Sequence, residues 1–224
     1  TGVEALIRDF VRARGGAGDL QIHTKYVPDL ATLGSLAAGD VAAAIDRSRT
    51  RLGVTTLDLV QLHWWDYERP GMIETAEWLH ARQRAGDVRH LGLTNCNTAA
   101  VEAIVGHGIP IVSHQVQYSL LDQRPAGAMT RVCAAHDIGL VAYGALAGGF
   151  LSERYLGAPA PAALANRSLV KYRLILDEFG GWERFQRLLT ALARVAARHD
   201  IAIGTVAVAW VLAQPLVAGV IVGA

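Results

Sequence analysis

The sequence predicts an α/β fold, a (β/α)8 TIM barrel, on three observations. Short runs rich in Val, Ile and Leu alternate with helical segments along the chain. These runs are apolar through nearly their whole length, as strands of a parallel sheet buried on both faces are. Most of them end in a side chain that forms hydrogen bonds, and such side chains gather at the C-terminal ends of barrel strands. No strand is followed by the GxGxxG loop that an open doubly wound sheet carries.

Each element has its own local signal. The predicted strands are residues 20–26, 57–63, 88–94, 111–116, 139–143 and 217–222. The predicted helices are residues 2–13, 41–52, 72–85, 98–107, 127–136, 185–198 and 205–213. Asp40 is expected to cap the second helix, Gly53 to end it, and Asn97 to cap the fourth. Residues 144–172 are rich in Gly, Pro and Ala, which predicts a long loop of the kind that forms lids or binding loops.

The composition limits the domain count and the partners. With 224 residues, 52% of them hydrophobic, the chain can bury a sizeable core, and we expect one barrel domain over residues 1–224 with about six of its eight strands. The net charge of +1 and the absence of a long basic run argue against nucleic acid or an anionic membrane as partner. Residues 201–224 carry no charge, but Gln214 and Pro215 divide them into a helix and a strand for a buried interior.

The cysteines and the first residues predict the compartment. Cys96 and Cys133 are too few for a disulfide framework and have no metal-ligand spacing, so we expect reduced thiols, a cytoplasmic protein and no bound metal. The first ten residues contain acidic side chains and no apolar run of signal-peptide length. We therefore expect no secretory leader or targeting peptide.

The polar strand ends form a series that resembles a known family. They lie in the motifs HTKY, LVQLHWW, GLTN, HQVQYS and AYGALAGGFL. Each motif alone has low specificity, but all five in this order, over almost the whole chain, resemble the aldo-keto reductase family. The resemblance implies a TIM barrel that reduces an aldehyde or ketone to an alcohol by hydride transfer from a nicotinamide cofactor, NADP(H) in most members and NAD(H) in others.

The resemblance assigns catalytic roles to two strand ends. Lys25 is similar to the lysine that lowers the pKa of the catalytic tyrosine, and His63 to the histidine that orients the substrate carbonyl. The first role is chemically sensible, because a phenol with a pKa near 10 donates a proton poorly at neutral pH unless a nearby cation stabilises its phenolate.

The resemblance also assigns residues to the cofactor. Thr94, Asn95 and Gln115 would hold the nicotinamide carboxamide, Tyr143 would stack on its ring, and the loop residues Gly144, Leu146, Gly148 and Gly149 would let backbone N–H groups approach the diphosphate. Other interpretations remain open for some of them: a helix cap for Asn95, a core ring for Tyr143 and a flexible connector for the loop.

Three aromatic residues close to His63 are expected to wall the substrate pocket. These are Trp64, Trp65 and Tyr67. Packing on the outer side of the barrel is an equal alternative for Trp65 and Tyr67.

The sequence departs from the family pattern at both ends. The catalytic tyrosine and aspartate of the family precede the lysine, and Thr1 would fall directly after the tyrosine. We therefore expect the first two strands, the first helix of the family and both residues to be absent, and the 224-residue chain alone to be nearly inactive. At the other end the chain stops at Ala224, where the family continues into the segment that binds adenosine.

Two further function classes stay open beside a carbonyl reductase that acts on a small molecule. One is a non-catalytic nucleotide-binding or regulatory barrel that lacks the proton donor. The other is an aldolase that forms a Schiff base on Lys25, which would leave the carboxamide-binding set without a role.

Overall fold

The computed structural model describes residues 2–223, so the predictions that involve Thr1 and Ala224 fall outside the described residues. The described residues form an α/β fold whose six strands are hydrogen-bonded in the order β1-β2-β3-β4-β5-β6. They divide into two compact units: unit 1 extends to His114 and includes His136–Ile138, and unit 2 contains Gln115–Ala135 and the described residues from Gly139 onward. A single barrel domain over residues 1–224 stays a prediction.

The observed elements follow the predicted alternation. The strands are β1 (His23–Tyr26), β2 (Leu57–Leu62), β3 (Val88–Thr94), β4 (Ile111–Gln117), β5 (Gly139–Tyr143) and β6 (Val217–Ile221). The α-helices are α1 (Gly2–Ala13), α2 (Ala38–Leu52), α3 (Met72–Arg84), α4 (Thr98–Gly106), α5 (Ala128–Ala135), α6 (Arg167–Phe179), α7 (Gly181–His199) and α8 (Ile203–Leu212). Short 3-10 helices occur at Leu30–Ser35, Ala147–Gly149 and Glu153–Tyr155.

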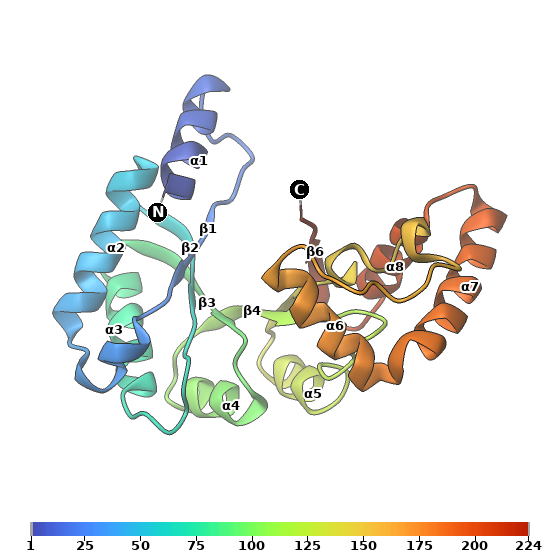
Figure 1. Cartoon of the computed structure of the whole chain (residues 1–224). Coiled ribbons are helices and arrows are strands. Elements are labelled where there is room, and N and C mark those ends of the chain that lie inside the picture. The colour runs from blue at the N-terminus through green and yellow to red at the C-terminus, as the bar shows by residue number, and fades with distance from the viewer. Residues whose placement is uncertain (1, 224) are drawn as a thin grey trace. The chain divides into compact units, whose positions relative to one another are not determined.

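Unit 1 is built on parallel pairing of β1 with β2 and of β2 with β3. Helices α2 and α3 lie on one side of these strands (Figure 1). Val41, Ile45 and Leu52 of α2 are buried, as their shared face predicted. Gly53 ends α2 in a left-handed conformation with φ 70°, and its N–H donates to Arg49.

The cap of α2 differs from the prediction. The N-cap is Ala37, and Asp40 lies three residues inside the helix, where its carboxylate accepts a hydrogen bond of 2.9 Å from the Ala37 N–H. The prediction that Asp40 is the N-cap is therefore wrong, because the acidic side chain binds back to the cap from the first turn. Asn97 does cap α4, since its side chain accepts from the Ala100 N–H at 2.8 Å.

Unit 2 contains a helix that the sequence analysis missed. Residues 144–172 were predicted to be a loop, but α6 begins at Arg167, inside that stretch, after Asn166 caps it by accepting from the Leu169 N–H. Tyr172, Ile175 and Leu176 of α6 are buried in an apolar cluster that also takes side chains from α7 and α8. Figure 1 shows α6 and α7 in succession in the C-terminal part of the chain.

No single helix among the described residues is long and apolar enough to cross a membrane. Taken together, the helices Gly181–His199 and Ile203–Leu212 are long and apolar enough by length and composition alone, but a bend of 94° separates them.

Candidate active site

Lys25 and His63 lie near the C-terminal ends of neighbouring parallel strands. In the register of β1 and β2, Tyr26 is opposite Leu62, and the N–H of His63 donates to the Tyr26 carbonyl at 3.0 Å. Partial burial lowers the pKa of Lys25. Partial burial, and secondarily the positive charge of Lys25, lower the pKa of His63. The positive charge of Lys25 thus acts on His63, and together with burial it favours the neutral form of the imidazole.

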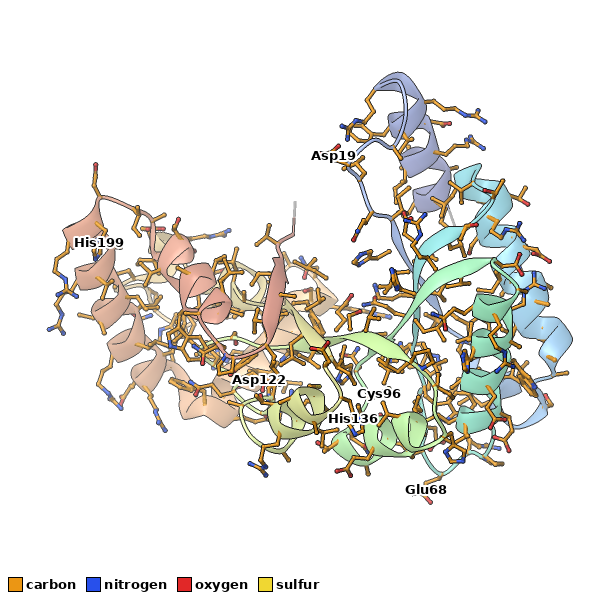
Figure 2. The ribbon with its side chains drawn as sticks, turned by 180° about the vertical axis from the view of Figure 1, so that it is seen from behind. Asp19, Glu68, Cys96, Asp122, His136 and His199 are labelled. Atoms are coloured by element: carbon orange, nitrogen blue, oxygen red, sulfur yellow. The ribbon has the colours of Figure 1, made fainter. Side chains whose placement is uncertain are left out.

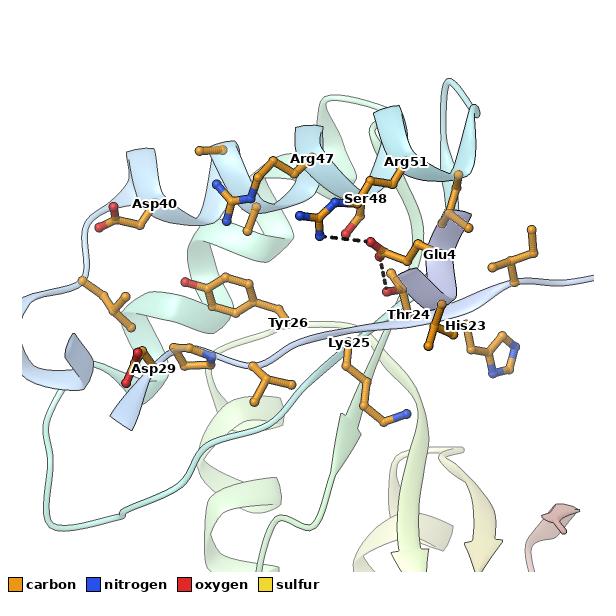
Figure 3. Close-up of a pocket in the computed structure, with 18 of the residues that line it drawn as sticks. Glu4, His23, Thr24, Lys25, Tyr26, Asp29, Asp40, Arg47, Ser48 and Arg51 are labelled. Atoms are coloured by element: carbon orange, nitrogen blue, oxygen red, sulfur yellow. Dashed lines mark hydrogen bonds and ion pairs between the residues drawn. The ribbon is translucent and has the colours of Figure 1, made fainter. Parts of the chain in front are cut away.

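The two faces of β1 carry different groups. Figure 3 shows Thr24 and Tyr26 pointing toward α2, while the side chain of Lys25 points to the opposite face, as the alternation of a strand requires. The face toward α2 borders a cavity of about 820 Å³ lined by α1, β1 and α2. Inside it the Glu4 carboxylate accepts from the Thr24 hydroxyl at 2.9 Å and from Arg51 at 3.5 Å. This cavity is therefore not the place to which the Lys25 ammonium points.

The three aromatic residues after His63 have different surroundings. The ring of Trp65 lies 4.3 Å from that of His63, and its indole N–H donates to the Pro28 carbonyl at 2.8 Å. Trp64 is buried in the core, where its N–H donates to the Asp66 carbonyl. The structure thus brings only Trp65 into ring contact with His63, and the assignment of all three to the substrate pocket stays a prediction.

Tyr67 supports the segment that follows β3. Its hydroxyl accepts from the Asn97 N–H at 2.9 Å and donates to the Asn95 carbonyl at 3.3 Å. This segment carries Asn95, which has the left-handed φ of 56° that asparagine tolerates better than most residues. Because Asn97 is the cap of α4, Asn95 does not have the capping role considered as its alternative.

Thr94 is the last residue of β3 and is buried. Its hydroxyl forms no hydrogen bond with any residue that the structure describes. Buried hydroxyl groups are normally paired, so this oxygen fits a ligand group that donates or accepts there, such as a carboxamide.

In unit 2, Gln115 is half-buried in β4 and Tyr143 ends β5. The ammonium of Lys171, on α6, lies 4.8 Å from the centre of the Tyr143 ring and 3.5 Å from its hydroxyl. One face of the Tyr143 ring is therefore in a cation–π contact with Lys171, which belongs to the same unit.

The loop after Tyr143 has the backbone conformations that its glycines allow. Gly144, Gly148 and Gly149 have φ values of 74°, 66° and 95°. Within the loop, the N–H of Ala147 donates to the Gly144 carbonyl and the N–H of Gly149 to the Leu146 carbonyl. A diphosphate would therefore have to bind other N–H groups of the loop.

The space beside this loop is filled by Tyr172 of α6. A Cβ atom placed on Gly144 would lie 2.6 Å from the Tyr172 hydroxyl oxygen, and one on Gly148 would lie 2.6 Å from its Cδ2. Lys171 and Tyr172 were not predicted as site residues, because residues 144–172 were predicted to be a loop. The cap residue Asn166 and the apolar spacing after it were the signals that could have revealed the helix.

A buried carboxylate lies near these residues in unit 2. Asp122, labelled in Figure 2, accepts two hydrogen bonds from Arg124, at 2.8 and 2.6 Å, and one from Gln117 at 2.6 Å. Although burial raises the pKa of Asp122, these contacts lower it overall. The carboxylate is thus a paired anion.

In the described part of the chain, the cysteines and the other possible metal ligands do not indicate a metal centre. Cys96 and Cys133 are free and buried, and burial raises the pKa of their thiols to about 12 and about 11. Among the described residues, no group of three or more His, Cys, Asp or Glu side chains could hold a metal ion.

Comparison with known proteins assigns the family. The sequence profile of the Aldo/keto reductase family matches residues 1–224. The chain is 30% identical to "Flagellar radial spoke protein 5" of Chlamydomonas reinhardtii over 93% of its own length and 47% of that protein. It is 28% identical to "Aldo-keto reductase yakc [NADP(+)]" of Schizosaccharomyces pombe over 78% of its own length and 50% of that protein. The chain thus spans about half the length of these relatives.

Solved structures of aldo-keto reductases resemble the structure of this chain. The thermostable aldo-keto reductase Tm1743, solved with the inhibitor epalrestat, aligns with 97% of this chain and 65% of its own, with a TM-score of 0.71 and 25% identity. The predicted fold class is confirmed: the six strands are part of a (β/α)8 barrel. This chain belongs to the aldo-keto reductase family.

Proposed function

We propose that the chain carries the lysine, the histidine and cofactor-binding residues of a reductase that converts an aldehyde or ketone to an alcohol with NADPH. The observation that carries the proposal is the position of Lys25 and His63 near two adjacent strand ends, where the charge of Lys25 acts on His63, in a chain of this family. The name of the fission yeast relative, which includes NADP(+), supports the choice of cofactor.

In the proposed reaction, Lys25 stays protonated and lowers the pKa of a tyrosine hydroxyl that donates a proton to the substrate oxygen. His63 is neutral, so it donates one N–H to the carbonyl oxygen without adding a second positive charge beside Lys25. Trp65 holds the imidazole by ring contact and is itself anchored by its bond to Pro28. Together these residues orient the carbonyl.

The cofactor, when bound, supplies the hydride. Its fit is supported in unit 1 by the unpaired hydroxyl of Thr94 and by the exposed, left-handed Asn95. In unit 2, Gln115, Tyr143 and the loop of Gly144, Leu146, Gly148 and Gly149 have the chemistry that a carboxamide, an aromatic ring and a diphosphate need.

The test is the substitution Lys25→Met, made in the 224-residue chain and in the whole natural polypeptide that contains it. We expect the rate of carbonyl reduction in the whole polypeptide to fall by about 10²–10⁴-fold or more, with little change in the dissociation constant of NADPH, because Lys25 acts on a proton and not on the nucleotide. The measurement is NADPH oxidation with an aromatic aldehyde, beside a fluorescence titration of NADPH.

Other outcomes would contradict this proposal in distinct ways. NADPH binding without turnover in either form would indicate a non-catalytic nucleotide-binding protein. Trapping of an aldehyde on Lys25 by borohydride would indicate an aldolase. If the 224-residue chain alone reduces aldehydes as fast as the whole polypeptide, the proton donor lies within these residues.

A further inference from the structure

A buried amide in the middle of β2 has no role in the reaction described above. Gln61 is 1% exposed, and neither its Nε2 nor its Oε1 forms a hydrogen bond with any described residue. Buried side-chain amides are nearly always paired, because an unpaired buried donor or acceptor loses its bonds to water without replacement. Gln61 therefore needs a partner, and the neighbouring strands limit which groups are within reach.

The strand register places Gln61 beside Lys25. In β1 and β2, Lys25 is directly opposite Gln61, and in β2 and β3, Gln61 is directly opposite Gly92. Residues at matching positions of adjacent parallel strands point to the same face of the sheet. Lys25 points away from α2 (Figure 3), so Gln61 shares its face, and so does His63 two residues later.

A second unpaired group reaches Gln61 across Gly92. A Cβ atom on Gly92 would lie 2.8 Å from the Ser113 hydroxyl oxygen and 3.2 Å from Cγ of Gln61. The missing side chain at Gly92 thus leaves the space in which these two side chains approach each other. The Ser113 hydroxyl is also buried and forms no hydrogen bond with any residue in the described part of the chain.

The three groups have complementary donors and acceptors. An ammonium only donates, a carboxamide has one acceptor and two donors, and a hydroxyl does both. The arrangement that satisfies the amide has the Lys25 ammonium donating to Oε1 of Gln61, while Nε2 of Gln61 donates to Oγ of Ser113. The reverse orientation would set the amide N–H groups against a cation.

We propose that Gln61 is a positioning residue for Lys25, held in its orientation by Ser113 through the gap at Gly92. The consequence rests on the proposed reductase function: the amide fixes the ammonium at the end of β1, where it acts on the proton donor. A hydrogen-bond acceptor at this point also opposes the partial burial that disfavours the charged form of Lys25.

The chain is well suited to a direct test, because Lys25 and Lys171 are its two lysines. Reductive methylation with ¹³C-labelled formaldehyde keeps the charge and one N–H on each lysine, so NMR titration of the 224-residue chain gives both pKa values in one sample. The lysine resonances are assigned with Lys171→Arg.

The variants at position 61 have opposite expected effects. Gln61→Leu should lower the pKa of Lys25 by about one unit, because the charged form loses its acceptor, and Gln61→Glu should raise it by at least as much. Ser113→Ala should lower it by less than Gln61→Leu does, because the amide is then only loosely oriented. Gln83→Leu, which removes a half-buried amide on α3 bonded to the Arg89 carbonyl, is the matched control.

The resonance of Lys171 should not move in any of these variants. If Lys25 titrates identically in wild type, Gln61→Leu and Gln61→Glu, all folded by circular dichroism, the proposal is wrong. Should Gln61→Leu fail to fold, the isosteric Gln61→Glu alone decides the matter, since a folded Gln61→Glu chain with an unshifted Lys25 overturns the proposal.

Failure of this proposal can be told from failure of the reductase function. If the pKa of Lys25 shifts in the Gln61 variants but Lys25→Met reduces aldehydes normally, the contact between Gln61 and Lys25 is confirmed and the reductase function is refuted. Unshifted titration with a strong effect of Lys25→Met would do the reverse. In the active whole polypeptide, Gln61→Leu should also move the alkaline limb of the kcat/KM profile to lower pH while Gln83→Leu leaves it in place.

Discussion

Unit 1 and unit 2 present their candidate residues in opposite ways. In unit 1 the buried hydroxyl of Thr94, which faces the cofactor in our proposal, has no hydrogen-bond partner among the described residues. In unit 2 the corresponding residues are covered by their own unit, because Lys171 lies over Tyr143 and Tyr172 fills the space beside Gly144 and Gly148. Unit 1 thus keeps a buried polar group without a partner, whereas in unit 2 side chains of α6 already contact the candidate residues.

The largest expected effect tests how tightly α6 covers the loop of unit 2. Gly148→Ala should reduce the free energy of unfolding by about 2–4 kcal/mol, because the new Cβ meets Tyr172 and the residue must keep a left-handed backbone. Gly149→Ala is the matched control, with a positive φ but no atom within 4 Å of its Cβ, and should cost only about 1 kcal/mol. Urea unfolding measures both.

Equal losses in these two variants would show that Tyr172 is not packed against the loop in solution. The double variant Gly148→Ala with Tyr172→Ala should regain part of the stability that Gly148→Ala loses relative to Tyr172→Ala alone, because the contact no longer exists.

The second prediction concerns the loss of stability in acid, which should begin at a higher pH in unit 1 than in unit 2. Burial lowers the pKa of His114 in unit 1 from 6.5 to about 4. Between these two values His114 binds a proton in the unfolded chain but not in the folded chain. Its contribution to the free energy of unfolding is therefore fully present above pH 6.5 and is lost as the pH falls toward about 4, by up to about 3 kcal/mol. In unit 2, Asp122 has a lowered pKa and loses its contribution only below the ordinary aspartate value of 3.8.

Urea unfolding at about neutral pH and at about pH 4.5 measures this difference. His114→Gln should flatten most of the decline, while the exposed His199→Gln in unit 2 should leave it unchanged. If His114→Gln declines with acid as steeply as wild type, the imidazole of His114 is not the group responsible.

The third prediction compares one carboxamide-binding candidate from each unit. Asn95→Ala in unit 1 and Gln115→Ala in unit 2 should each raise the dissociation constant of NADPH by about 2- to 10-fold, since each loses hydrogen bonds of about 0.5–1.5 kcal/mol. Fluorescence titration measures the constant, with Gln83→Leu as the control. Unchanged affinity in both variants would remove these two residues from the cofactor site.

The smallest expected effect tests whether Lys171 competes with the cofactor for the ring of Tyr143. Lys171→Met should tighten NADPH binding by about 2- to 5-fold, because the cation–π contact of about 0.5–1 kcal/mol no longer has to be broken. Arg173→Met, two residues along the same helix and paired with Asp177, is the control and should have no effect. Weaker binding by Lys171→Met would instead make Lys171 a ligand of the nucleotide.

The sequence by itself determined the alternation of strands and helices and the polar residues at the strand ends. Both are local signals, because a buried parallel strand is apolar throughout and a strand that surfaces ends in a polar side chain. Lys25 and His63 were found in this way, and their neighbouring positions follow from the order of the strands. Family motifs then supplied the roles that local patterns do not contain.

Only the tertiary structure decided which side chains meet. The approach of Ser113 in β4 to Gln61 in β2 depends on the register of β2 with β3 and on the missing side chain of Gly92 in β3, and register is set by packing between strands far apart in sequence. The contact of Lys171 with the ring of Tyr143 depends likewise on how α6 packs in the core of unit 2. These contacts join residues 28 and 52 positions apart, and the periodicity within a single segment carries no information about such pairs.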